Sequence, residues 1–268
     1  MEIDEFLTRI GVKEASPTIF KIEERATLNV NNPENGEATE TSKGIKTYTK
    51  TEDKSITVIG FLTYDKPFPE QIFAIPSEDL RNLMAESERI EIQESKLMGY
   101  GAMDFSFNLQ ILENSKTIKP KYDNDPVFLD KDTIKKILRV ANVLDIKDSD
   151  STSSTYIDAD GKNLTITLVN KLGNKGTVVI PSEFPEIHSR FENRFVECLK
   201  LVGDNDVELN LDGYNPAREH KAHGLARIEM MDSNAIISYY IREITQKVQE
   251  SKKAKKEKKE ESEVPPEE

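Results

Sequence analysis

The stretch "AIPSEDLRNLMAESERIEI", Ala74–Ile92, has a counterpart about a hundred residues later in "VIPSEFPEIHSRFENRFVECLKLVGDNDVEL", Val179–Leu209. In each stretch an apolar strand leads into Ile-Pro-Ser-Glu, and an amphipathic segment and an alternating segment follow. Proline, a hydroxyl side chain and acidic residues are typical of the positive start of a helix. Both stretches therefore predict strand, helix and strand, with the second helix over Phe184–Leu201 and Gly203 at its end.

The residues around these two stretches repeat the same order. A helical pattern opens each half, at Ile3–Ile10 and, behind the cap Asp130, at 131–144. Alternating segments at 18–30 and 45–62, and later at 155–157, 163–170 and 176–180, are typical of strands. The chain is therefore predicted to be a tandem duplication of an α+β unit. In each unit an antiparallel sheet carries two helices on one face.

The predicted domain boundaries follow from this repeat and from two polar segments. We expect a first domain at residues 1–115, a connector at 116–126 and a second domain at 127–245. The tail at 246–268 is rich in Lys and Glu without apolar periodicity, so we expect it to be disordered, with a weak contact to a partner as the alternative.

Composition limits the class of protein. The single cysteine, Cys198, fits a reducing compartment, and no apolar run approaches the roughly 20 residues of a membrane span. We therefore expect a soluble cytoplasmic protein that does not enter membranes. The net charge of −12 argues against nucleic-acid binding only if the charges are spread evenly over the surface.

The cations are not spread evenly. On the helix at 131–144, Lys131, Lys135 and Arg139 recur at intervals of four opposite the apolar stripe, with Lys136 beside them. A solvated helix face is the simpler explanation of one such row. The acids gather elsewhere, in "ESERIEIQES" and "LDIKDSDS", so a basic surface on an otherwise acidic protein is the alternative that we favour.

Two segments carry a resemblance to a known family. "TIKKILRVANVLDI", Thr133–Ile146, is similar to the opening helix of the second domain of phage clamps. "GLARIEMMDSNAIISYYIREI", Gly224–Ile244, is similar to the last hairpin of cellular clamps, including the paired tyrosines. Together with the duplicated α+β unit, they resemble the DNA sliding clamps, a family that includes the proliferating cell nuclear antigen and the processivity factors of T-even phages. The tail and the loop at 31–44 depart from the family pattern.

The resemblance implies a non-catalytic processivity factor. Three two-domain subunits would form a ring around double-stranded DNA, with strand edges paired between subunits. Its partners would be the DNA polymerase and the clamp loader. The expected DNA-facing residues are Arg9, Lys13, Arg81, Lys131, Lys135, Lys136, Arg139, Arg190 and Arg194. By position, Ile118, Tyr122, Ile241 and Ile244 would border the pocket for partner peptides.

The remaining candidates for chemistry are weaker. His220 and His223 have a spacing that some metal sites use, but they lie in a predicted loop without a nearby cysteine. Cys198 lies among apolar residues with no base beside it, which favours an inert thiol. We therefore expect no metal, cofactor or catalytic residue. The alternatives are a non-catalytic phage or viral structural or assembly protein with a duplicated β-rich fold, and a hydrolase built on the histidine loop.

Overall fold

The computed structural model describes residues 1–28, 39–112, 120–147, 152–214 and 223–244, with the side chains at 26–28, 39–41 and 223 left out. Residues 1–112 are here called the first half, and 120–244 the second half. The first half contains α1 (Ile3–Ile10), β1 (Thr18–Leu28), β2 (Thr39–Lys50), β3 (Ile56–Thr63), β4 (Phe73–Ile75), α2 (Ser77–Glu86), β5 (Arg89–Gln93), β6 (Lys96–Tyr100), β7 (Phe105–Asn108) and β8 (Gln110–Ile111). The second contains β9 (Val127–Leu129), α3 (Lys131–Val143), β10 (Ser154–Ala159), β11 (Asn163–Val169), β12 (Lys175–Pro181), β13 (Ile187–Glu192), α4 (Arg194–Val202), β14 (Val207–Tyr214), β15 (His223–Asp232) and β16 (Ala235–Arg242).

The two halves repeat one pattern of elements and pairings. Each runs helix, three-stranded meander, short strand, helix and second meander. In both halves the short strand pairs antiparallel with the first strand of the first meander, β4 with β1 and β13 with β10. The predicted α+β class and the duplication are confirmed.

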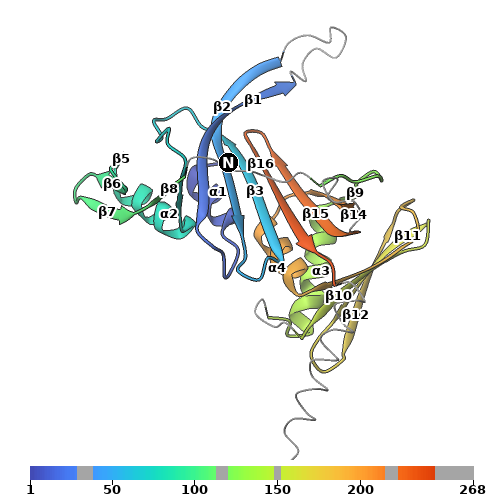
Figure 1. Cartoon of the computed structure of the whole chain (residues 1–268). Helices are drawn as coiled ribbons and strands as arrows, with labels where there is room; N and C mark the ends of the chain where they lie inside the picture. The colour runs from blue at the N-terminus through green and yellow to red at the C-terminus, as the bar shows by residue number, and fades with distance from the viewer. Residues whose placement is uncertain (29–38, 113–119, 148–151, 215–222, 245–268) are drawn as a thin grey trace, which may run out of the picture.

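The sheets join the halves instead of remaining within them. A nine-stranded sheet runs β8-β4-β1-β2-β3-β16-β15-β14-β9, so its centre is the pairing of β3 with β16 (Figure 1). A four-stranded sheet, β12-β11-β10-β13, and a three-stranded sheet, β5-β6-β7, complete the fold. The joint buries Val58, Ile237 and Tyr239 completely, which explains why β3 pairs with a strand so distant in sequence.

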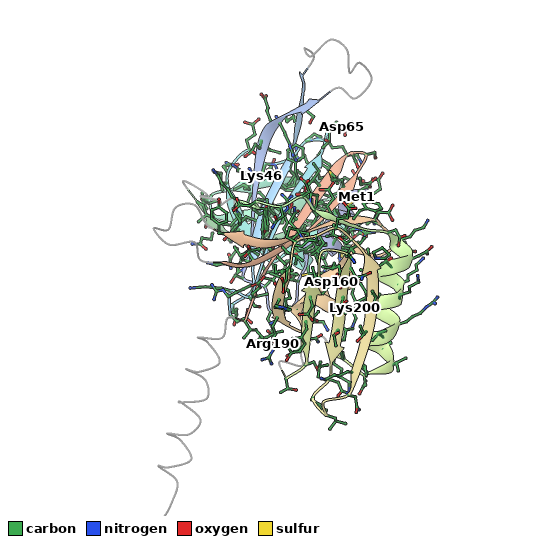
Figure 2. All side chains as sticks on the ribbon, turned by 90° about the vertical axis from the view of Figure 1, so that its right-hand side faces the viewer. Met1, Lys46, Asp65, Asp160, Arg190 and Lys200 are labelled. Carbon is green, nitrogen blue, oxygen red and sulfur yellow. The ribbon has the colours of Figure 1, made fainter. Side chains whose placement is uncertain are left out.

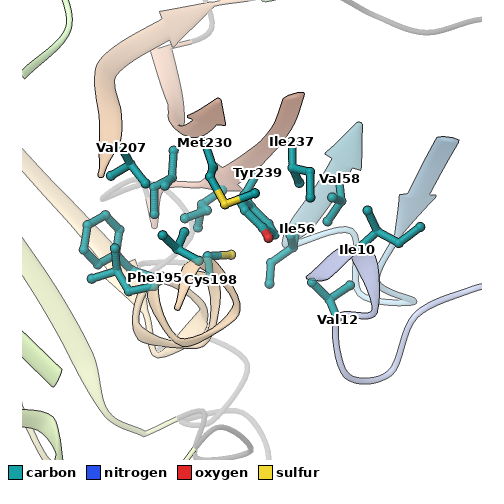
Figure 3. Close-up of a cluster of buried hydrophobic side chains, with 14 of the residues drawn as sticks. Ile10, Val12, Ile56, Val58, Phe195, Cys198, Val207, Met230, Ile237 and Tyr239 are labelled. Atoms are coloured by element: carbon teal, nitrogen blue, oxygen red, sulfur yellow. The ribbon is translucent and has the colours of Figure 1, made fainter. Parts of the chain in front are cut away.

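The four helices form a single row against the sheets. Helix α2 packs on α1, α1 on α4, and α4 on α3. Beneath α4 and the end of α1 lies a core drawn from both halves, including Ile10, Ile56, Cys198 and Tyr239 (Figure 3). The halves are therefore one packed body on the helix side as well as through the sheet.

The two Ile-Pro-Ser-Glu sequences occupy different places in the repeat. The first joins β4 to α2, whereas the second ends β12 and leads through a loop into β13. The predicted helix over Phe184–Leu201 is wrong in its first part, because residues 187–192 form β13 and the helix begins at Arg194. Only the order of elements, and not the four shared letters, reflects the duplication.

The error at β13 has a simple physical origin. Ile187, Phe191 and Phe195 are four residues apart, and a spacing of four keeps residues on one side of a helix and also on one face of a strand. In the structure Ser189 is buried between Ile187 and Phe191 while His188 is exposed, which is the period of a strand.

Other predicted details are confirmed. The carboxylate of Asp130 accepts a hydrogen bond from the backbone N–H of Thr133 and caps α3. Helix α4 ends at Gly203 with φ of 66°, a left-handed conformation that favours glycine. Strands β15 and β16 turn at Ser233 and Asn234. Ile118, His220, the tail at 246–268 and part of the 31–44 loop lie outside the described residues.

Candidate nucleic-acid interface

Helix α3 presents a row of exposed cations. Its cap fixes where the helix begins, and the fully buried Ile134, Ile137 and Ala141 fix its rotation against β11 and β12. The opposite side of the helix is therefore exposed, as Figure 2 shows by the nitrogen-tipped side chains that extend from α3 away from the sheet. The exposed cations are Lys131, Lys135, Lys136 and Arg139, all four as predicted from sequence to share one helix surface.

An acidic loop between α4 and β14 borders this row. Asp204 Oδ1 lies 3.0 Å from Lys135 Nζ, and Asp206 accepts a hydrogen bond from the backbone N–H of Lys131. The hydrogen bond from Lys135 lowers the pKa of the Asp204 carboxyl below its usual value. Both side chains of the pair are well exposed, so water screens the attraction and Lys135 can exchange its partner for another anion.

Arg9 is not part of an open cationic surface. Its guanidinium donates hydrogen bonds to the carbonyls of Leu201 and Val202, at the negative end of α4, and it pairs with Glu5 at 2.6 Å. Its side chain is only 14% exposed. The structure therefore assigns Arg9 to the contact between α1 and α4, and the expectation that it faces DNA is corrected.

Arg194 also lies in the junction between the halves. Its guanidinium is 2.9 Å from Glu197, 2.6 Å from Glu14 and 3.5 Å from Asp53, and the residue is 9% exposed. Burial alone would lower the pKa of Arg194, but the hydrogen bonds with Glu197 and Glu14 raise it. A cation held by three carboxylates is not available to phosphates, so its predicted place among the DNA-facing residues is corrected too.

The other three predicted cations lie in three different settings. Arg190 is on β13, where it donates to Ser154 Oγ and its guanidinium lies over the Tyr156 ring. It is therefore not on a helix, which corrects the sequence assignment. Lys13 follows α1 and is exposed. Arg81 on α2 is about one third exposed and donates to Thr8 of α1.

Sequence reasoning missed Lys200. It is exposed in the last turn of α4, a helix that is otherwise almost entirely buried, and Figure 2 labels it. The sequence could have indicated it, because Gly203 marks the end of the helix and Lys200 lies three residues before it. Cations are favoured in that last turn.

Of the residues predicted to border a peptide pocket, the structure describes Tyr122, Ile241 and Ile244. Ile241 is 1% exposed and belongs to the core, so it cannot line an open pocket, and this prediction is corrected. Ile244 donates its backbone N–H to the carbonyl of Arg190. Tyr122 packs its ring beneath the guanidinium of Arg227 and against Gly213, where burial raises the pKa of its phenol.

Other kinds of site receive little support in the described part of the chain. No three potential metal ligands of the described residues lie together. Within the same residues, no helix is long and apolar enough to cross a membrane. Cys198 is fully buried, and burial raises the pKa of its thiol well above the usual value, which suppresses the reactive thiolate.

The structure of about 90% of the chain is similar to that of solved sliding clamps. The proliferating cellular nuclear antigen of Entamoeba histolytica matches with a TM-score of 0.59 and 13% identity, over 90% of this chain and 96% of that one. The β sliding clamp of Caulobacter crescentus matches with a TM-score of 0.58 and 13% identity over 91% of this chain. The DNA polymerase III β subunit of Pseudomonas aeruginosa matches with a TM-score of 0.61 and 11% identity, again over 91% of this chain.

The chain is similar to these clamps in structure and not in sequence. The chain spans 64% of the Caulobacter clamp and 62% of the Pseudomonas subunit. A scan against protein families and a search of curated proteins gave no match to the sequence. The repeated α+β unit, the sheet shared between the halves and the row of four helices together show that this chain has the sliding-clamp fold.

Proposed function

We propose that this protein is a DNA sliding clamp, a non-catalytic processivity factor that encircles duplex DNA and tethers a replicative polymerase. The observation that carries the proposal is the exposed cation row of α3, which lies on the helix layer of a clamp fold in a chain of net charge −12. Lys and Arg on such a layer attract phosphates without reading bases. Contacts of this kind suit a protein that must move along DNA.

The proposed DNA-facing set differs from the sequence expectation. It keeps Lys131, Lys135, Lys136 and Arg139 of α3, with Lys200 of α4 beside them. Lys13 and Arg81 belong to the first half, and Arg81 lies on α2 at the other end of the helix row, so neither is part of this set. Arg9, Arg190 and Arg194 are instead assigned to holding the fold together.

Two unpaired strand edges support assembly into a ring. Among the described residues β12 pairs only with β11, and β7 pairs only with β6. In the repeat, β12 corresponds to β3 and β7 to β16, the two strands that form the joint between the halves. They lie at opposite ends of the molecule, so pairing of β12 with β7 of the next copy is head to tail (Figure 1).

The side chains at these edges fit such a joint. Val178 and Ile180 on β12, and Phe105 and Phe107 on β7, are partly exposed, whereas Val58, Ile237 and Tyr239 at the corresponding β3–β16 joint are fully buried. We propose that the next subunit covers them, in a ring of three copies. The two units of each copy would be residues 1–115 and 127–245, joined by the connector at 116–126.

The polymerase and a clamp loader are the proposed partners. The protein is proposed to act in the cytoplasm, which is the host cytoplasm if the source is a phage or virus. These assignments rest on the clamp fold.

Mass and retention on DNA test the proposal. The mass of the purified protein measured by sedimentation should be near three times the 30.4 kDa chain mass. Once placed on DNA, it should remain on a circular duplex and leave a linear one by the ends. A structural or assembly protein without a ring would show equal retention on both forms, and that result would exclude the clamp.

Charge placed in the proposed joint gives a sharper test of the ring. Val178→Glu or Phe107→Glu should yield folded monomers near 30.4 kDa, because a carboxylate would be buried against apolar residues of the next copy. The matched control is Thr165→Glu, on the inner strand β11 and half-buried, which should leave the ring intact. Rings formed by the Val178→Glu and Phe107→Glu variants would show that these edges are not the joint.

A further inference from the structure

The charge on the four helices is divided between the two halves. Helix α3 has four cations, Lys131, Lys135, Lys136 and Arg139, against one acid, Asp132. Helices α1 and α2 together have two cations, Arg9 and Arg81, against five acids, Asp4, Glu5, Glu78, Asp79 and Glu86. The layer is therefore cationic at one end and anionic at the other, which the sequence row on α3 alone does not reveal.

Packing increases this difference at the surface. Arg9 is occupied by the end of α4, and Arg81 lies within 3.8 Å of Glu78 and 3.9 Å of Asp4. The acids themselves face solvent, with Asp4 75% and Glu78 77% exposed. The exposed surface of α1 and α2 therefore carries a net negative charge, which repels a polyanion.

We infer that duplex DNA is held against the second-half helices alone and is repelled by α1 and α2. The inference rests on the proposed function, in which DNA runs along the helix layer. In a ring, attractive and repulsive segments would then alternate around the duplex. Charges separated by more than about 8–10 Å of salt solution hardly interact. Each helix therefore attracts or repels only the part of the duplex that lies next to it. The duplex would rest on one patch per subunit rather than on a uniform lining.

The number of phosphate contacts sets the salt dependence of binding. Each contact contributes about 0.9 to the slope of log affinity against log salt concentration. Between about 50 and 200 mM salt, two contacts therefore account for roughly a tenfold change in affinity. Loss of contacts on α3 should be visible as a shallower slope, which a loss of stability would not produce.

Three double variants and one single variant test the inference, with binding of a short linear duplex followed by fluorescence anisotropy at several salt concentrations. Raising the salt from about 50 to 200 mM should weaken binding by Lys136→Ala/Arg139→Ala about tenfold less than it weakens binding by the unmodified protein, if each mutated side chain makes one phosphate contact. Glu78→Gln/Glu86→Gln should bind DNA more tightly than the unmodified protein. Arg81→Ala should bind no more weakly. The control Lys96→Ala/Lys162→Ala removes two exposed cations outside the helices and should change nothing.

The outcomes separate the inference from the proposed function. Weaker binding by Arg81→Ala, equal to that of Lys136→Ala/Arg139→Ala, would overturn the inference, as would weaker binding by Glu78→Gln/Glu86→Gln. If the α3 variant keeps the full salt slope while the protein still forms rings and stays on circular DNA, the inference is wrong and the clamp proposal stands. A protein that neither forms rings nor distinguishes circular from linear DNA would instead remove the clamp proposal itself.

Discussion

Arg194 is a largely buried cation at the junction between the halves. It pairs with Glu197 on its own helix and with Glu14 and Asp53 of the first half, and Glu197 also accepts the backbone N–H of Lys13. Arg194→Met should destabilise the protein by about 3–5 kcal/mol, because the Glu197 carboxylate, 4% exposed, would be left without its cation. Chemical denaturation measures this loss.

A second variant shows whether the buried carboxylate causes that loss. Arg194→Met/Glu197→Gln removes both charges, keeps an oxygen for Lys13, and should recover much of the stability. The control Arg89→Met removes an arginine that is 65% exposed and should cost about 1 kcal/mol or less. Equal losses in all three proteins would show that the pair makes no special contribution.

Asp53 should make the junction sensitive to acid. Burial raises the pKa of its carboxyl, but hydrogen bonds from Ser55 and Thr51 and the charge of Arg194 outweigh this and lower it to about 2. A lowered folded-state pKa adds stability above the usual value near 4, and this stability is lost as the pH falls from about 4 to 2. Unfolding measured across that range should show a smaller drop for Asp53→Asn than for the unmodified protein. An unchanged drop would assign the acid sensitivity to other carboxylates.

At the scale of elements, the sequence was informative where the spacing of apolar residues fitted either a helix or a strand but not both. The α3 pattern at Ile134, Ile137 and Ala141 fits only a helix, and its cap, length and exposed cations are all found as predicted. The pattern at Ile187 and Phe191 fits both periods, so β13 was taken for a helix and Arg190 for a helix-face cation. Arg9 and Arg194 failed for another reason, because the α4 carbonyls that bind Arg9, and the Glu14 and Asp53 carboxylates that bind Arg194, are distant in sequence.

The approach of α3 to its sheet depends on Gly176 of β12. A Cβ atom there would lie 2.3 Å from Val140 Cγ1, so no side chain fits unless Val140 shifts. Gly176→Ala should therefore cost about 1–3 kcal/mol in thermal or chemical unfolding. Adding Val140→Ala should restore part of the loss by removing the clashing methyl groups. If Val140→Ala does not rescue Gly176→Ala, the cost comes from the backbone instead of from this contact.

At the scale of the whole molecule, the shared sheet could not be predicted from sequence patterns. An alternating segment indicates a strand with one buried face, but it does not name the neighbouring strand. The pairing of β3 with β16 is decided by tertiary packing around Val58 and Tyr239. The order of elements, by contrast, was readable except at β13, which is why the duplication was recognised despite the misplaced Ile-Pro-Ser-Glu match.

The proposed ring should come apart before the chain unfolds. The joint within the chain pairs seven residues of β16 with β3, whereas β7 offers four residues to a neighbour. Dilution should therefore produce folded monomers of 30.4 kDa, seen as a falling sedimentation coefficient with an unchanged circular dichroism spectrum. Loss of secondary structure together with dissociation would show instead that the chain needs its neighbours to fold.

The position of β16 near the end of the sequence also has a consequence for synthesis. Strand β3 is finished at Thr63, but the strand that covers its edge starts at Ala235. At about 5–20 residues per second, a ribosome needs roughly 10 to 35 seconds to travel between them. Throughout that interval the nascent polypeptide carries an open apolar edge, the type of surface that chaperones bind and that aggregates grow from.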